Sequence, residues 1–264
     1  MTLLFFVLTF AITWTSWTAA RSFPALQLPL LYLGIFAPAF VALTLTAWRE
    51  KSAGLLALMR RLVEWRVGAR WYLFAFGYMA AIKLTVAVIH RVAVGAWPRF
   101  GDEPWFLMIA ATVFFFVGQT GEEIGWRGYA LPRLAARFGF AGASVILGVI
   151  WACWHLPLFL FFFPGNDVYG QSFPLYLLQV TAISVAIAWL YVNAKGSLLL
   201  TMLMHSAINN TKDIVPSAVP GATNAWALST SPVAWLTVVL LWIFAIYFLV
   251  RMKLYTPYKE LAIA

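Results

Sequence analysis

Three short polar clusters interrupt an otherwise apolar chain, and their side chains are of the types that activate water in hydrolases. Two adjacent carboxylates, a nearby arginine and two of the chain's three histidines lie within or at the ends of long apolar runs. Placing an ionisable group in membrane hydrocarbon costs about 2.5–3.5 kcal/mol on insertion scales, so such groups are rarely kept without a function. The clusters predict one hydrolytic site inside a membrane, built from Glu122, Glu123, Arg127, His155, His205 and Asn209.

The first cluster places Glu122, Glu123 and Arg127 on a stretch that we expect to be helical. Neighbouring helical residues point about 100° apart, because one turn takes 3.6 residues. Glu123 and Arg127 are four positions apart and can pair along one face, which leaves Glu122 directed elsewhere. A poorly hydrated carboxylate suits a base that acts on water near neutral pH. The alternative is a solvated charge cluster where a span meets the cytoplasm.

The two histidine clusters also allow a structural and a functional interpretation. His155 lies deep in an apolar run, where Trp151 can pack on the imidazole and Pro157 can bend the helix or free a carbonyl. A single His among aromatic residues is often only structural. His205 and Asn209 share one helical face, where they can orient water, bind an oxyanion or supply two metal ligands. Their alternative role is hydrogen bonding between packed helices.

The composition is that of an integral membrane protein. The 264 residues are 63% hydrophobic and 10% charged, and the mean hydropathy is +0.86. A soluble domain needs far more polar surface. A net charge of +9 would suggest nucleic-acid binding in a soluble protein. Here the basic residues flank apolar runs, which favours anionic lipid as the partner and no nucleic acid.

Eight apolar runs are candidates to cross a bilayer, which takes about 20 residues. They cover residues 1–20, 28–48, 71–94, 105–123, 141–163, 173–193, 197–210 and 232–250. The alternating segments of a barrel are absent, so the sequence predicts an all-α polytopic protein with one membrane domain, residues 1–264. With the N-terminus inside, thirteen Lys and Arg, Arg127 among them, fall in cytoplasmic segments and four in outer segments. This asymmetry predicts that both termini are cytoplasmic.

Two further features carry no assigned role. Lys83 lies near the middle of the third apolar run, where it can snorkel or pair with a carboxylate. Residues 55–66 alternate apolar and charged side chains. They indicate either an amphipathic helix at the membrane surface or an ordinary basic loop.

Taken together, the clusters resemble the pattern of the CPBP family, which contains the type II CAAX prenyl endopeptidases and bacteriocin-processing relatives, also called Abi proteins. That pattern is Glu-Glu-x-x-x-Arg, then an aromatic-x-x-x-His, then His-x-x-x-Asn. The core of the similarity covers residues 105–210, which we expect to be the catalytic core. With Trp in place of the usual Phe, the pattern falls on Glu122, Glu123, Arg127, Trp151, His155, His205 and Asn209.

The resemblance implies an intramembrane endopeptidase with a cavity open to the cytoplasm. In that family pattern Glu122 activates water with help from His155, the Glu–Arg pair of the first motif supports the site, and His205 with Asn209 stabilises the oxyanion. The expected partners are the lipid bilayer and a membrane-tethered or prenylated peptide. The expected location is multi-pass in a bacterial plasma membrane.

Two alternatives stay open at this point. Glu122, His155 and His205 supply the set of two His and one Glu that a catalytic zinc favours. The chain has no His-Glu-x-x-His helix, and the proposed base would become a ligand, so we expect no cofactor, with Zn²⁺ as the alternative. The rival function is a proton-coupled transporter, since intramembrane ionisable residues also build proton relays. A non-catalytic scaffold is a third interpretation, against which the complete motif set argues.

Overall fold

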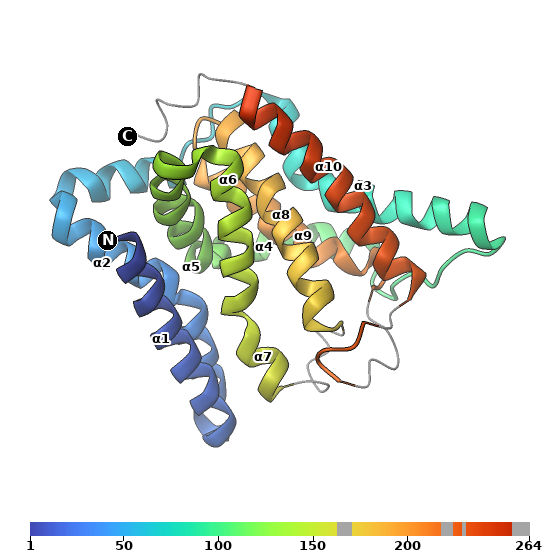
Figure 1. The fold of residues 1–264 in the computed structure, drawn as a ribbon, viewed down its shortest axis with the longest axis horizontal. Coiled ribbons are helices and arrows are strands. Elements are labelled where there is room, and N and C mark those ends of the chain that lie inside the picture. Colours follow the sequence, from blue (N-terminus) through green and yellow to red (C-terminus); the bar gives the residue numbers. More distant parts are fainter. Residues whose placement is uncertain (163–170, 218–223, 229–230, 255–264) are drawn as a thin grey trace.

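The structure, a computed structural model, describes residues 1–162, 171–217, 224–228 and 231–254. These residues form a bundle of helices without strands (Figure 1), so the predicted all-α class is confirmed. The α-helices are α1 Thr2–Ser22, α2 Gln27–Leu62, α3 Ala69–Val94, α4 Trp105–Phe115, α5 Thr120–Glu123, α6 Leu131–Trp154, α7 Leu156–Phe161, α8 Phe173–Asn193, α9 Leu198–Thr211 and α10 Pro232–Leu254. Between them lie three 3₁₀ turns and one π-helix: η1 Pro24–Leu26, η2 Phe116–Gln119, η4 Lys212–Ile214 and the π-helix η3 Ile124–Ala130.

Several of these helices are suited to cross a membrane. In the described part of the chain, six are long and apolar enough to do so, which confirms the polytopic class. The predicted fourth and fifth spans both fall in one helical run, Trp105–Phe161. Helix α9 has 14 residues and is not among the six. The total of eight spans and the cytoplasmic termini therefore stay predictions.

The fourth apolar run was predicted to end at residue 123, but the helical chain continues beyond this residue. The chain continues from α5 through η3 into α6, and it turns sharply at Gly139, whose φ is +66°. Glu122 and His155 lie 17 and 16 residues from this turn. At about 1.5 Å per residue, both arms are about 25 Å long. The hairpin thus returns His155 to the level of Glu122.

The π-helix η3 lies directly against α2. A Cβ atom added at Gly125 would be 2.4 Å from the Cβ of Pro38, so only glycine permits this approach. π-helical turns widen the backbone and are frequent at functional sites. The seven residues of η3 follow Glu123 directly, and they set the direction in which the first motif presents its side chains.

The predicted surface helix within residues 55–66 is largely confirmed. Helix α2 breaks at Lys51, whose φ is +57°, and continues to Leu62. The segment is held on the bundle, because Arg61 Nη1 donates to the Tyr191 hydroxyl at 2.9 Å. The loop alternative is therefore wrong up to Leu62, while contact with the membrane surface stays a prediction.

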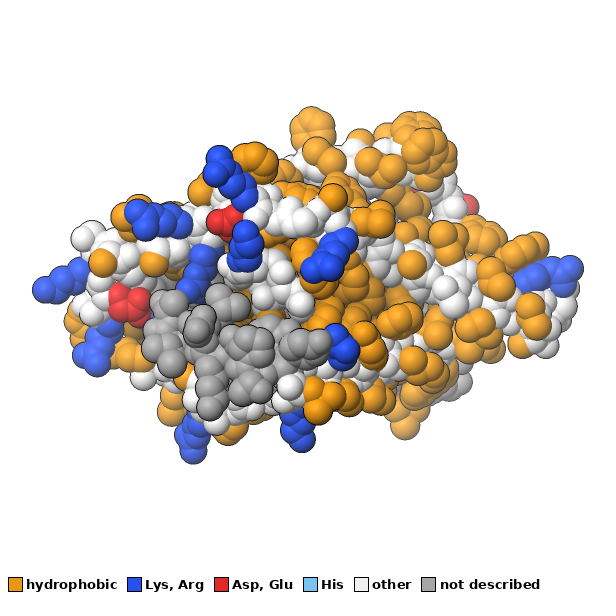
Figure 2. All heavy atoms as spheres, turned by 90° about the horizontal axis from the view of Figure 1, so that it is seen from above, with side chains coloured by type: hydrophobic (Ala, Val, Ile, Leu, Met, Phe, Trp, Pro, Cys, Tyr) orange, Lys and Arg blue, Asp and Glu red, His pale blue; other side chains and the backbone are white. Residues whose placement is uncertain are grey.

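Basic side chains gather at one end of the bundle, which Figure 2 shows face on. Contacts tie these segments together: Arg133 pairs with Glu50, and Lys195 Nζ donates to the Arg66 carbonyl at 3.0 Å. Arg127 is an exception to the predicted charge count, because it is fully buried inside the bundle. We call this the basic end; its described cations are Arg49, Lys51, Arg60, Arg61, Arg66, Arg70, Arg133, Arg137, Lys195, Arg251 and Lys253.

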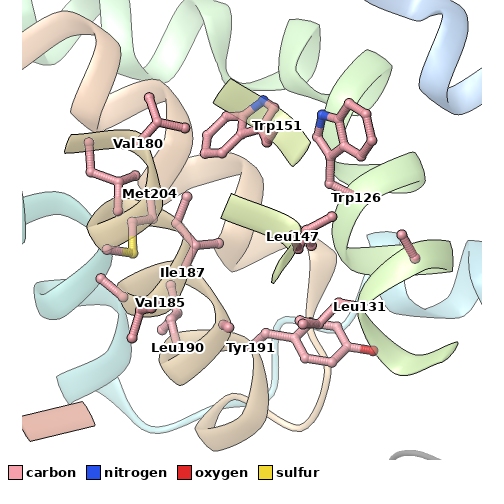
Figure 3. Close-up of a cluster of buried hydrophobic side chains, with 14 of the residues drawn as sticks. Trp126, Leu131, Leu147, Trp151, Val180, Val185, Ile187, Leu190, Tyr191 and Met204 are labelled. Carbon is pink, nitrogen blue, oxygen red and sulfur yellow. The ribbon is translucent and has the colours of Figure 1, made fainter. Parts of the chain in front are cut away.

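Helix α8 forms the centre of the molecule. Of its most apolar window, 89% is buried within the protein, whereas only 33–39% of the windows of α1, α3 and α10 is buried, as expected for helices that face lipid. Figure 3 shows Ile187 and Tyr191 of α8 in one cluster with Leu147, Trp126 and Trp151. This packing joins α8 to the α6 hairpin and so supports the elements that carry the motifs.

Candidate active site

The three motifs meet at one cavity of about 530 Å³. Its lining includes Glu122 from α5, Trp151 and His155 from the end of α6, and His205 and Asn209 from α9. This confirms the prediction that the side chains of Glu122, His155 and His205 surround one cavity. Glu123 and Arg127 are not among the residues that line it, and both are fully buried.

Glu122 is held by two tryptophan side chains. Its Oε2 atom accepts hydrogen bonds from Trp151 Nε1 at 2.6 Å and from Trp126 Nε1 at 3.3 Å. The carboxylate is 8% exposed and faces the cavity. Both indole donors use the same oxygen, so among the described residues Oε1 has no competing donor. The sequence predicted only that Trp151 packs on the His155 imidazole, and its hydrogen bond to Glu122 was not expected. The role of Trp126 was missed, although its i,i+4 spacing from Glu122 was the available signal.

Glu123 organises a buried ionic network behind the cavity. Its Oε1 lies 2.7 Å from Arg127 Nη1, which confirms the predicted i,i+4 pair. The same oxygen lies 2.9 Å from His205 Nδ1, a contact that the sequence did not predict. The Arg127 guanidinium also lies over the Trp151 ring, 4.4 Å from its centroid. Since a carboxylate only accepts, His205 Nδ1 carries the proton in this contact, and the ring orientation is fixed.

His155 lies at the break between α6 and α7, the position that Pro157 predicted for a bend. Its Nδ1 is 2.9 Å from the Trp151 carbonyl. A carbonyl can only accept, so Nδ1 donates and, in the neutral ring, Nε2 is the unprotonated nitrogen. Aromatic rings enclose the imidazole: the centroid of Trp154 lies 4.6 Å away and that of Tyr176 5.3 Å away. Both of these neighbours limit the access of water to His155.

The cavity extends away from the basic end. Helix α8 lines it with residues between Tyr176 and Ile183, whereas Tyr191, nearer its other end, binds Arg61. Helix α9 likewise contributes its second half, and the lining continues to Lys212. Charge placement predicts that this end of the bundle is outside the cytoplasm. That expectation differs from the cytoplasmic opening implied by the family resemblance.

The arrangement does not match a metal site. In the described parts of the chain, no three His, Cys, Asp or Glu side chains are grouped so that they could hold an ion. Of the proposed zinc ligands, Glu122 accepts from two indole N–H groups at Oε2, and these donors compete with a cation for that oxygen. The Nδ1 contacts of His155 and His205 are also usual for metal-bound His and do not distinguish the two cases. The chemistry at this cavity is therefore assigned to the side chains alone.

The protein is a helical membrane bundle with a carboxylate, two imidazoles and an amide around one cavity. It therefore falls in the class of intramembrane proteins that have a polar site suited to activating water. Comparison with known proteins specifies this class. Residues 104–211 match the family model of the type II CAAX prenyl endopeptidases, Rce1-like. The chain is also 22% identical over 230 residues to the CAAX prenyl protease 2 of Methanococcus maripaludis, covering 80% of this chain and 84% of that protein. The family resemblance inferred from the three motifs is confirmed.

Both matches are to peptide hydrolases, and they support an endopeptidase embedded in the membrane. Neither match points to a transporter. The matched region contains every residue of the three motifs, but the roles of the individual side chains rest on the geometry described above.

Proposed function

We propose that this protein is an intramembrane endopeptidase with its catalytic core in residues 105–210, and that it hydrolyses a peptide bond of a membrane-tethered substrate. The observation that carries the proposal is the single cavity shared by Glu122, His155, His205 and Asn209. Because the similar proteins are named CAAX prenyl proteases, a prenylated CAAX-type peptide is the first substrate to test. A bacteriocin-type precursor is the next.

In this proposal Glu122 is the general base. The indole N–H groups of Trp151 and Trp126 fix Oε2, and Oε1 accepts a proton from a water molecule in the cavity. His155 lines the cavity, its ring held by the contact of Nδ1 with the Trp151 carbonyl, and it orients that water. The oxygen of the water attacks the peptide carbonyl, and the proton on Glu122 later passes to the leaving amine. General acid–base catalysis of this kind contributes about 10²–10⁴-fold.

His205 and Asn209 are placed to stabilise the oxyanion. His205 Nδ1 donates to Glu123, so donation from Nε2 to the oxyanion requires a ring with both protons. The Glu123 carboxylate, which Arg127 also contacts, offsets part of the charge that this form brings. Asn209 lies one turn further along α9 and supplies an amide N–H. One such donor is worth about 2.7–4 kcal/mol of transition-state stabilisation. Glu123 and Arg127 act as positioning residues, because they touch His205 and Trp151 rather than the cavity.

The proposal is tested with the purified protein in liposomes and a farnesylated CAAX-type peptide. Mass spectrometry should find two fragments whose masses add up to peptide plus water. Glu122→Gln should abolish both fragments, whereas the exposed control Glu103→Gln should leave them unchanged. A proton flux that depends on Glu122, together with an uncut peptide, would instead support the transporter.

A further inference from the structure

Lys83 is a buried cation that the proposed mechanism does not use. It lies in α3, is 1% exposed and lines the same cavity as Glu122. Its Nζ donates to the Val215 carbonyl at 2.9 Å and to the Ser217 hydroxyl. Both acceptors are neutral, and an ammonium group has three hydrogens to donate. Among the described residues only these two accept from Lys83, which leaves one hydrogen for a ligand in the cavity.

No carboxylate is in direct contact with Lys83: across the described ranges no Asp or Glu oxygen lies within 4.0 Å of its Nζ. Lys212 and Asp213 also line this part of the cavity, and their charges act on Lys83 in opposite senses, with that of Asp213 the larger. Burial lowers the pKa of Lys212, and the adjacent Asp213 carboxylate opposes that shift. Burying an ammonium with no carboxylate in contact is costly, and a negatively charged ligand that enters the cavity holds Lys83 in its charged form.

The position of this cation relative to the site fits a peptide terminus. Along α9 and η4, Lys212 lies seven residues beyond His205, which is about 10 Å at 1.5 Å per residue. Val215 and Ser217, which hold Lys83, come three and five residues after Lys212. An extended peptide spans about 3.3–3.6 Å per residue, so roughly three residues reach from the reacting carbonyl to this region.

We propose that Lys83 binds the free C-terminal carboxylate of the peptide substrate and so sets how far from that terminus the chain is cut. The proposal rests on the endopeptidase function proposed above. A peptide already brings one carboxylate into the cavity, and the side-chain amides of Gln171 and Gln179 in the lining can pair with its backbone. A lipid phosphate presents similar chemistry and is the other source of an anion.

Two farnesylated peptides of one sequence, one with a C-terminal carboxylate and one with a carboxamide, test the proposal. Wild-type protein should cut the acid about 10- to 100-fold more efficiently in kcat/KM, the range expected for a hydrogen bond to a charged group. Lys83→Met should reduce this ratio to about 1, mainly through KM of the acid. Lys83→Arg should restore part of it, and Lys195→Met, at the basic end, should leave it unchanged.

The amide peptide is the internal reference, because it lacks the charge that Lys83 binds: Lys83→Met should lower kcat/KM of the acid far more than that of the amide. If wild type cuts both peptides equally, the carboxylate site is wrong while the endopeptidase stands. If Lys83→Met changes only the dependence of the rate on anionic phospholipid, the ligand is a lipid phosphate and the proposal is overturned. If neither peptide is cut, the proposed function itself fails.

Discussion

Glu123→Gln should destabilise the protein strongly, because it removes the carboxylate from a fully buried ionic network. Glu123 and Arg127 are both 0% exposed and lie 2.7 Å apart, and His205 Nδ1 lies 2.9 Å from the same Oε1 atom. Removing one partner of a buried pair costs about 3–5 kcal/mol, since the other charge is left uncompensated. The amide of Gln keeps the shape of the side chain, so this loss is mainly electrostatic.

The chain provides a matched control on its surface. Arg99 and Asp102 lie 3.0 Å apart, but their side chains are 78% and 86% exposed. Exposed pairs contribute about 0–1 kcal/mol, so Asp102→Asn should have little effect. The free energy of unfolding can be followed by SDS titration in mixed micelles, using the fluorescence of the 14 tryptophans.

The double variant Glu123→Gln/Arg127→Met extends the test. It removes both charges, so it should be more stable than Glu123→Gln alone. Two results would contradict this electrostatic explanation. One is that Glu123→Gln lowers the free energy of unfolding no more than Asp102→Asn does. The other is that adding Arg127→Met to Glu123→Gln lowers it further.

Three other measurements test separate parts of the description. In a Cys153→Ala background, Asp213→Cys should react with a membrane-impermeant maleimide in intact cells, because the cavity is expected to open outside the cytoplasm. Arg137→Cys, at the basic end, should react only after permeabilisation. The reverse pattern would show that the cavity opens to the cytoplasm. Gly125→Ala should cost about 1–3 kcal/mol of stability, because the new methyl group overpacks against Pro38. Gly77→Ala should have no such cost, because no atom lies within 4 Å of the new Cβ. Equal effects would contradict the packing of η3 on α2. Chelators such as 1,10-phenanthroline should leave peptide cleavage unchanged, and a loss that Zn²⁺ restores would establish the metal alternative.

Local helix geometry made part of the site predictable. The spacing of four residues between Glu123 and Arg127 placed them on one helical face, and the structure has them in contact. The same spacing joins His205 to Asn209, and both line the cavity. Such pairs follow from the 3.6-residue turn alone, without knowledge of the packing.

The convergence of the motifs depends on features that spacing does not encode. The π-helix η3 and the turn at Gly139 carry Glu122 to the level of His155. The π-helix forms where the chain packs against α2, and the turn uses the positive φ of +66° that glycine permits. The contact between Glu123 and His205 joins residues 82 positions apart. For the same reason Lys83 had no evident partner in the sequence, since the acceptors that hold it lie more than 130 residues away.

A double-variant kinetic cycle can decide whether Glu122 and His205 act on one reacting group in one cavity. Initial rates of cleavage of the farnesylated peptide are measured for wild type, Glu122→Gln, His205→Ala and the double variant. Residues that act as a unit are strongly non-additive, so the double variant should be within a few-fold of the slower single variant. If the fold-losses in rate of the two single variants multiply in the double variant, or if either single variant keeps the wild-type rate, the shared site is contradicted.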